Sequence, residues 1–279
     1  EFIKNGPNTI DNSELNRVKA FFTEPNYIKD TKNDLESHIQ DKSFSQWLSR
    51  CTQSHKKNYY RSVTLSLKSN HQAPGDATSE QMQYVADLAD EYSFGEIRVS
   101  HEQNLILADV HEDNLYELWN KAKNHHLATP NIGLITDIIC CPGGDFCSLA
   151  NAKSIPIAES IQQVFDDMDY LHDIGDINLN ISGCMNACGH HHVGHIGILG
   201  VDKDGSEWYQ VTLGGNQGNF ANIGKVIGPS FSADEMPVVI RKIVDTYVKE
   251  RHSDETFIDC VIRIGLEPFK LTVYGKKAN

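Results

Sequence analysis

Residues 183–197 read GCMNACGHHHVGHIG and hold two cysteines and four histidines among glycines. Cysteine and histidine are frequent ligands of zinc, copper and iron–sulfur clusters, so this stretch predicts a metal site. A second stretch, residues 140–147, reads CCPGGDFC and supplies three more cysteines. We expect the fold to bring these two stretches together.

The ligand spacing bears on which group the cysteines hold. Cys141 and Cys147 are separated by five residues, and Cys184 and Cys188 by three. Structural zinc sites usually use a shorter spacing than the first of these. Four thiolates on two wide, glycine-containing loops suit a bulkier group, and we interpret them as ligands of a [4Fe–4S] cluster. Zinc and a redox-active dithiol remain the alternatives from spacing alone.

The other three cysteines, Cys51, Cys140 and Cys260, are expected to be packed residues. An odd total of seven, with no secretion signal, favours metal or redox chemistry over a disulfide framework. The expected location is therefore the reducing cytoplasm.

Composition argues against two classes of function. The net charge of −13 over 279 residues disfavours nucleic-acid binding, which requires a basic face. The sequence has no run of about 20 apolar residues, so no membrane span is predicted.

Hydrophobic periodicity predicts an α+β chain in three parts. Residues 1–58 are polar and irregular, and we interpret them as an N-terminal arm or linker. Residues 59–128 are expected to form an α+β half-sandwich in the order strand, helix, strand, strand, helix, with Thr78 and Gln81 as a capping box before a helix over 79–91. Residues 129–279 are expected to form a mixed α/β domain that carries both cysteine stretches. In this domain the patterns predict a helix over 155–171, a hairpin turn at Asp204-Gly205 and a helix that follows the capping box of Ser232 and Glu235.

The paired cysteine pattern, with Asn186 inside CMNAC and glycine after it, resembles the sulfite and nitrite reductases that carry sirohaem and a [4Fe–4S] cluster. The stretch that begins APGDATSEQMQYVADLADEYSFGEIRVS is similar to the ferredoxin-like repeat of that family. NISGCMNACGHHHVGHIGILGVDKDGSEWYQVTLGG is similar to its bacterial assimilatory sulfite reductase haemoproteins. The resemblance covers roughly residues 60–275.

The resemblance implies a six-electron reduction of sulfite to sulfide. Cys141, Cys147, Cys184 and Cys188 would hold the cluster. Cys188 would also bridge to the sirohaem iron, which makes it the predicted catalytic residue. The reduction of nitrite to ammonia with the same cofactors is the alternative within this family. A zinc-stabilised structural or interaction module is the alternative of another class.

Other residues near these motifs are candidate cofactor contacts. Asn186 is either a hydrogen-bond donor that tunes the site or a turn former. The histidines and loop glycines either donate hydrogen bonds to the sirohaem carboxylates or serve packing and turns. The full set of candidate cofactor-binding residues is Asn186, His190, His191, His192, Arg98, Gly214 and Gly215.

Cations for a small oxyanion substrate are scarce. Lys153 is the only Lys or Arg between Cys140 and Gly200. The chain begins Glu-Phe-Ile rather than Met. The resemblance implies a pseudo-twofold fold in which the first half supplies most of the anion-binding Arg and Lys residues. We therefore expect this chain to be the C-terminal half of such a reductase and inactive alone. Its expected partners are the N-terminal half and an electron donor, either a flavoprotein or a ferredoxin.

Overall fold

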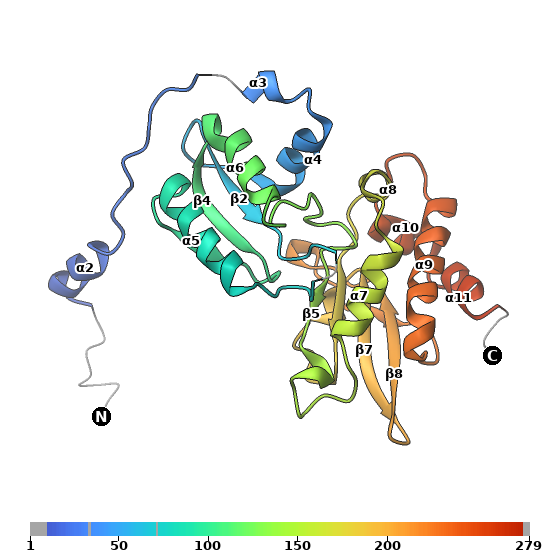
Figure 1. The fold of residues 1–279 in the computed structure, drawn as a ribbon. Helices are drawn as coiled ribbons and strands as arrows, with labels where there is room; N and C mark the ends of the chain where they lie inside the picture. Colours follow the sequence, from blue (N-terminus) through green and yellow to red (C-terminus); the bar gives the residue numbers. More distant parts are fainter. Residues whose placement is uncertain (1–9, 33–34, 71, 276–279) are drawn as a thin grey trace, which may run out of the picture.

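The computed structural model describes residues 10–32, 35–70 and 72–275, which form two units that follow each other along the chain (Figure 1). Each unit has its own sheet and its own hydrophobic core. The first sheet has four strands and the second has five. This mixed architecture confirms the predicted α+β class. Within the described residues, none of the helices combines the length and apolar character needed to cross a membrane.

The first sheet is antiparallel, with strand order β1-β2-β4-β3. The predicted order of strand, helix, strand, strand and helix is found as β2, α5, β3, β4 and α6, and β1 adds an edge strand. The elements of this unit are α4 (Lys42–Cys51), β1 (Thr52–Ser54), β2 (Tyr60–Leu65), α5 (Ser79–Tyr92), β3 (Ile97–Val99), β4 (Leu105–His111) and α6 (Leu115–Lys123).

The N-terminus of α5 carries the predicted capping box. The Thr78 hydroxyl accepts a hydrogen bond from the Gln81 backbone N–H at 3.1 Å, and the Gln81 side chain accepts one from the Thr78 N–H at 3.0 Å. Two of the four backbone donors left free at a helix start are thereby satisfied. The helix begins at the predicted residue and ends one residue later than predicted.

Helix α4 lies inside the predicted arm of residues 1–58, yet it packs in the core of the first unit. Phe44, Trp47 and Cys51 are fully buried. Their spacing of three and four residues places them on one face of the helix, against β1, β2 and α6. We therefore place the proposed start of the ferredoxin-like unit at α4 rather than at residue 59.

The chain before α4 includes α2 (Asn12–Lys19) and α3 (Leu35–His38). Between them, the Tyr27 hydroxyl donates a hydrogen bond to Asp109 in β4 at 2.6 Å. The segment around Tyr27 therefore lies against the first sheet. Figure 1 shows α2 set apart from both units.

The second sheet has strand order β5-β6-β7-β8-β9. The pairs β5–β6 and β6–β7 are parallel, and the pairs β7–β8 and β8–β9 are antiparallel. Asp204 and Gly205 form the predicted tight turn, with φ values of 54° and 79° that fit a type I′ hairpin. The strands are β5 (Ile139–Cys140), β6 (Leu179–Ser182), β7 (Ile196–Lys203), β8 (Ser206–Leu213) and β9 (Lys225–Val226).

The prediction of one helix over residues 155–171 is wrong, because the structure has two helices here. The backbone leaves the helical region at Phe165, and the Asp167 carboxylate then accepts hydrogen bonds from the N–H groups of Asp169 and Tyr170. This N-cap starts a second helix. The helices of the second unit are α7 (Ile155–Val164), α8 (Met168–Ile174), α9 (Met236–Glu250), α10 (Phe257–Ile264) and α11 (Glu267–Tyr274).

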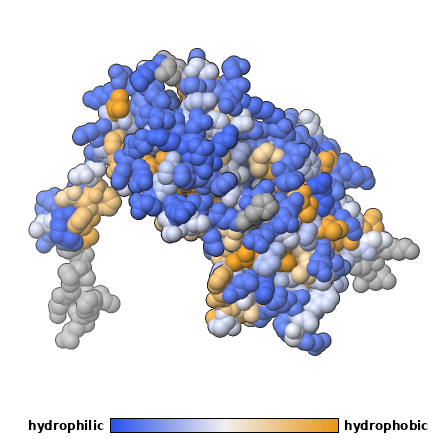
Figure 2. Space-filling view, viewed as in Figure 1, coloured by the Kyte–Doolittle hydropathy of each residue, from blue (hydrophilic) through white to orange (hydrophobic). Residues whose placement is uncertain are grey.

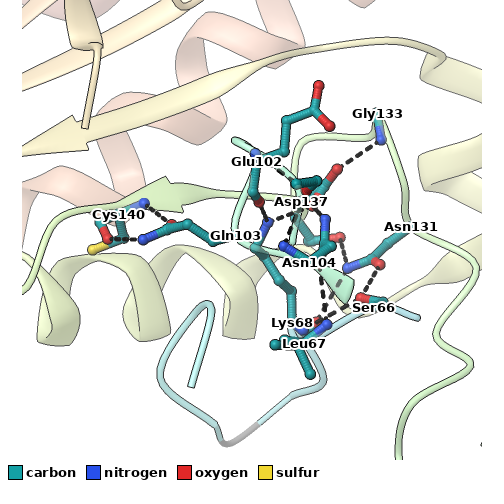
Figure 3. A network of polar contacts seen from close by, with 12 residues as sticks. Ser66, Leu67, Lys68, Glu102, Gln103, Asn104, Asn131, Gly133, Asp137 and Cys140 are labelled. Carbon is teal, nitrogen blue, oxygen red and sulfur yellow. Dashed lines mark hydrogen bonds and ion pairs between the residues drawn. The ribbon is translucent and has the colours of Figure 1, made fainter. Parts of the chain in front are cut away.

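A buried polar network joins the two units (Figure 3). The ammonium group of Lys68, whose side chain is 0% exposed, lies 2.6 Å from the carboxylate of Asp137. The Asn104 side-chain amide and the Gly133 N–H each donate to the same carboxylate at 3.0 Å. Lys68 also donates to the carbonyl of Glu102. The network fixes the loop between β3 and β4 against the chain that leads into β5.

Candidate metal centre

The sheet topology brings the two cysteine stretches together. Cys141 directly follows β5, and Cys184 comes two residues after β6 ends. β5 and β6 are neighbouring parallel strands, with Cys140 paired with Ile181. The carboxyl ends of parallel neighbours meet at one edge of a sheet, where ligands of α/β proteins usually bind.

All four predicted ligands line one cavity of about 100 Å³. None of them forms a disulfide. Among residues 10–32, 35–70 and 72–275, no three His, Cys, Asp or Glu side chains lie close enough together to hold a single metal ion. The four thiols share the lining of this one cavity. The cavity is lined by Cys141, Pro142, Gly143, Cys147, Leu149, Ala150, Gly183, Cys184, Asn186 and Cys188.

The sulfur of Cys141 is held by hydrogen bonding from the other cysteine loop. The Gly183 N–H donates to it at 3.1 Å, and the Ser154 hydroxyl lies 3.6 Å away. Hydrogen bonds to ligand sulfurs are one of the means by which a protein sets the potential of an iron–sulfur cluster. The sequence pattern gave no signal for Ser154.

The four thiols differ in their exposure. Cys184 is buried, Cys141 and Cys147 are half-buried, and Cys188 is exposed. Cys188 is therefore the thiol best placed to contact a second group outside the cavity.

Two glycines allow the cysteine loops to touch through their backbones. A Cβ added at Gly183 would lie 2.7 Å from the Ala152 carbonyl oxygen and 2.8 Å from the Cα of Gly143. A Cβ at Gly143 would meet Ser154 N at 2.5 Å, and its φ of 57° is also unfavourable for other residues. These positions require glycine because the loops approach too closely for a side chain.

Replacing Gly183 with alanine should therefore lower the free energy of unfolding of the metal-free chain by about 1–3 kcal/mol, the usual cost of overpacking. Gly144 lies on the other cysteine loop, next to Gly143, but its added Cβ would approach no atom closer than 3.4 Å. Gly144→Ala is the matched control and should have little effect. Urea unfolding followed by circular dichroism measures both variants, and equal midpoints would contradict the close-contact explanation.

Cys140 adjoins a predicted ligand but lies in the hydrophobic core. Burial raises the pKa of its thiol well above the usual range. Thiolates, not thiols, bind metals, so this residue is poorly suited to be a ligand. Cys51 and Cys260 are also fully buried, as predicted for packed residues.

Asn186 lines the four-cysteine cavity. The left-handed backbone position in this loop is Ala187, with φ 56°, and Asn186 is not among the residues with positive φ. The Ala187 N–H donates to the Cys184 carbonyl at 3.1 Å, which makes Asn186 a central residue of a β-turn. Asn186 therefore both forms a turn and lines the cavity, and its role beside the bound group remains a prediction.

The three consecutive histidines, His190–His192, lie in different surroundings. His190 and His192 are exposed, whereas His191 is buried at 1% exposure. Burial lowers the pKa of the His191 imidazole to about 4, so the ring is neutral near pH 7. Its Nδ1 has no hydrogen-bond partner among the described residues. A buried ring nitrogen in this state is free to hydrogen-bond to a bound group.

The remaining candidates have structural explanations of their own. A Cβ at Gly215 would collide with the carbonyl oxygen of Gly194, so close backbone approach accounts for this glycine. Gly214 has φ 85° and donates its N–H to the carbonyl of His195. Their roles as cofactor contacts remain predictions.

Arg98 lies on the edge strand β3, where its guanidinium forms an ion pair with Glu96 at 2.6 Å. Its side chain is 60% exposed and does not line the four-cysteine cavity. The structure therefore does not bring Arg98 together with the cysteines.

An apolar rim surrounds the cysteine loops. Phe146, Leu149 and Met185 are 80%, 69% and 82% exposed. Figure 2 shows hydrophobic surface at the lower end of the molecule, below the β5 label of Figure 1. Lys153, the one Lys or Arg in the sequence between Cys140 and Gly200, lies 3.7 Å from the Asp145 carboxylate. The rim therefore offers apolar contact area but little free positive charge.

Comparison with known proteins gives two family matches. Residues 133–279 match the sequence model described as the nitrite and sulphite reductase 4Fe-4S domain, and residues 53–125 match the nitrite/sulfite reductase ferredoxin-like half domain. The first match alone covers more than half of the chain. It confirms the cluster type predicted from the cysteine spacing and argues against the zinc module.

Curated relatives include both kinds of reductase. The assimilatory ferredoxin-dependent nitrite reductase of Haloferax mediterranei is 30% identical over 191 residues, which cover 66% of this chain and 32% of that protein. The sulfite reductase [NADPH] hemoprotein beta-component of Yersinia pestis is 29% identical over 185 residues, which cover 65% and 31%. The chain spans about a third of the length of these relatives.

A solved structure, that of the Mycobacterium tuberculosis NirA protein, agrees with the fold. It superposes with a TM-score of 0.65 at 26% identity over 78% of this chain and 40% of that chain. The ferredoxin-like unit, the four-cysteine cavity and the family matches lead to one conclusion: the chain belongs to the family of nitrite and sulphite reductase 4Fe-4S domains.

Proposed function

We propose that this chain is the cluster-bearing half of a reductase that converts sulfite to sulfide in a six-electron reaction. The observation that carries the proposal is the single cavity lined by Cys141, Cys147, Cys184 and Cys188. When bound, the [4Fe–4S] cluster would supply electrons one at a time, and sirohaem would supply the iron at which the oxyanion is reduced. One of the relatives is named a hemoprotein, which supports the second cofactor.

The chain's own residues have distinct roles in this proposal. The four thiolates would hold the cluster, and Gly183 N–H would hydrogen-bond to the sulfur of Cys141. Cys188, the exposed thiol, would bridge to the sirohaem iron. Asn186 and the orphaned Nδ1 of His191 would hydrogen-bond to the bound groups.

The exposed apolar rim supports the presence of a covering partner. Exposed aromatic and aliphatic side chains beside a buried cofactor site are typical of an interface. We propose that the N-terminal half of the same reductase covers this face and supplies the substrate-binding cations. The donor would be a ferredoxin or a flavoprotein, since the relatives' names include both ferredoxin and NADPH dependence. The free cysteines suit the reducing cytoplasm.

Nitrite reduction to ammonia is the second candidate, because nitrite reductases match this chain as well as sulfite reductases do. Steady-state kcat/KM for both anions separates the two functions. We expect sulfite to have the higher value in the longer reductase that contains this chain. A higher value for nitrite would reverse the assignment.

The isolated 279-residue chain should have little activity, even with a rebuilt cluster. Lys153, the one Lys or Arg in the sequence between Cys140 and Gly200, lies 3.7 Å from the Asp145 carboxylate, so this stretch offers little free positive charge to the oxyanion. We expect turnover at least about 100-fold below that of a full-length relative, since removing even one oxyanion-stabilising group costs about that much. Sulfide formation with reduced methyl viologen as donor measures it, with the Yersinia haemoprotein as the control. Turnover equal to the control would contradict the half-enzyme interpretation.

A further inference from the structure

The side chain of Gln103 makes two hydrogen bonds to the backbone of Cys140, the residue before a predicted cluster ligand. Its Oε1 accepts from the Cys140 N–H at 2.8 Å, and its Nε2 donates to the Cys140 carbonyl at 2.7 Å (Figure 3). Gln103 belongs to the loop between β3 and β4 of the ferredoxin-like unit, whereas Cys140 belongs to β5 of the second unit. The contact therefore crosses from one unit to the other.

The two hydrogen bonds from Gln103 give partners to backbone groups of an edge strand. β5 is at the edge of its sheet, so one side of its backbone has no neighbouring strand. Cys140 is only 4% exposed, and its N–H and C=O would be costly to bury without partners. A primary amide presents one donor and one acceptor side by side, which matches the two backbone groups of one strand residue. Gln103 thus takes the place of a further neighbouring strand for β5.

The backbone at Gln103 has an unusual conformation that the neighbouring contacts hold in place. Gln103 itself has φ 59°, a left-handed conformation that is unfavourable for a residue with a side chain. The residues on either side are anchored to the network between the units, Glu102 through Lys68 and Asn104 through Asp137. A Cβ at Gly75 would lie 2.8 Å from the Cβ of Gln103. The backbone of Gln103 is therefore held through both of its neighbours, and Gly75 lies close to its Cβ.

The contact between Gln103 and Cys140 also affects the position of Cys141. The N–H of Cys141 donates to Ile181 of β6 at 3.1 Å, and its sulfur accepts from Gly183. Both contacts come from the second unit, to which Cys141 belongs. Gln103, which belongs to the ferredoxin-like unit, holds the preceding residue Cys140. A change in the position of Cys140 moves Cys141 directly, because the two residues are adjacent.

We propose that Gln103 is a positioning residue for the cluster ligand Cys141, so that docking of the ferredoxin-like unit sets the geometry and potential of the cluster. This inference rests on the proposed role of the four cysteines as cluster ligands. Groups that orient the ligands of a metal site typically contribute about 10–100-fold in affinity.

The test uses cluster reconstitution in the 279-residue chain under anaerobic conditions. Gln103→Met keeps the length of the side chain but removes the amide. Gln103→Glu keeps its shape but places a carboxylate against the Cys140 carbonyl. Gln83→Met is the matched control, because Gln83 is exposed on α5 of the same unit. The readouts are the rate of cluster loss to a chelator and the midpoint potential and EPR spectrum of the reduced cluster.

We expect both Gln103 variants to lose the cluster about tenfold faster than Gln83→Met, and to show a shifted midpoint potential while the metal-free chains remain folded. Potentials and loss rates equal to those of Gln83→Met would overturn the proposal. Unfolding of both metal-free Gln103 variants would also overturn it, since the residue would then serve only the packing of the two units. If the unaltered chain takes up no iron and sulfide, the proposed function itself fails.

Discussion

Replacing Cys184 with alanine should abolish assembly of the cluster. Cys184 is the buried member of the four ligands and lies just beyond the end of β6. A [4Fe–4S] cluster requires a protein ligand for each iron in the four-cysteine arrangement, and no other thiol of the described residues lines the cavity. We expect reconstituted iron to fall from about four per chain to below about one. Iron and acid-labile sulfide assays after desalting measure the change.

The matched control is Cys140→Ala, which removes a thiol one residue from the ligand Cys141. Because Cys140 is buried and its pKa is raised, this variant should still assemble the cluster in full. Full iron content in Cys184→Ala, or its loss in Cys140→Ala, would contradict the assignment of the ligands.

The second large effect is expected at the ion pair between the units. Replacing Asp137 with alanine leaves the ammonium group of Lys68 buried without its carboxylate. It also removes the acceptor of Asn104 and Gly133. Breaking a buried ion pair from one side costs about 3–5 kcal/mol, and we expect a loss of this size in the free energy of unfolding. Urea unfolding of the metal-free chain measures it.

An exposed ion pair provides the control for this variant. Lys42 of α4 and Asp169 of α8 also join the first unit to the second, at 2.6 Å, but their side chains are 71% and 63% exposed. Asp169→Ala should cost less than about 1 kcal/mol, because water solvates the separated charges. Similar small losses in both variants would show that the Lys68–Asp137 pair does not hold the units together.

Local patterns predicted the features that depend on neighbouring residues. The capping boxes at Thr78 and Ser232 and the Asp204-Gly205 turn depend on residues at most three positions apart, and all are present. The spacing of the four cysteines favoured the cluster, because ligand spacing and loop width limit the groups that fit, but it left zinc and a redox-active dithiol as alternatives.

Two features of the fold had signals in the sequence that the predictions did not use. The stripe of Phe44, Trp47 and Cys51 has helical spacing and indicates a buried face, so a core position for α4 could have been predicted. Asp167 is a strong N-cap residue and marks the break between α7 and α8.

The contacts between the units could not have been predicted in this way. Lys68 and Asp137 are 69 residues apart, and Gln103 and Cys140 are 37 apart. No local periodicity or residue spacing predicts either contact, because each depends on how two separately formed units pack. The close approach of Gly143 and Gly183 likewise depends on the pairing of β5 with β6.

The central claim is that the four cysteines bind a [4Fe–4S] cluster. Its most direct test is the content of iron, zinc and acid-labile sulfide per chain, measured anaerobically with an absorption spectrum of the same sample. We predict iron and sulfide near about four each, with a broad charge-transfer absorption and no stoichiometric zinc. One zinc per chain and no sulfide would contradict the claim and would make the cysteine cavity a structural metal site.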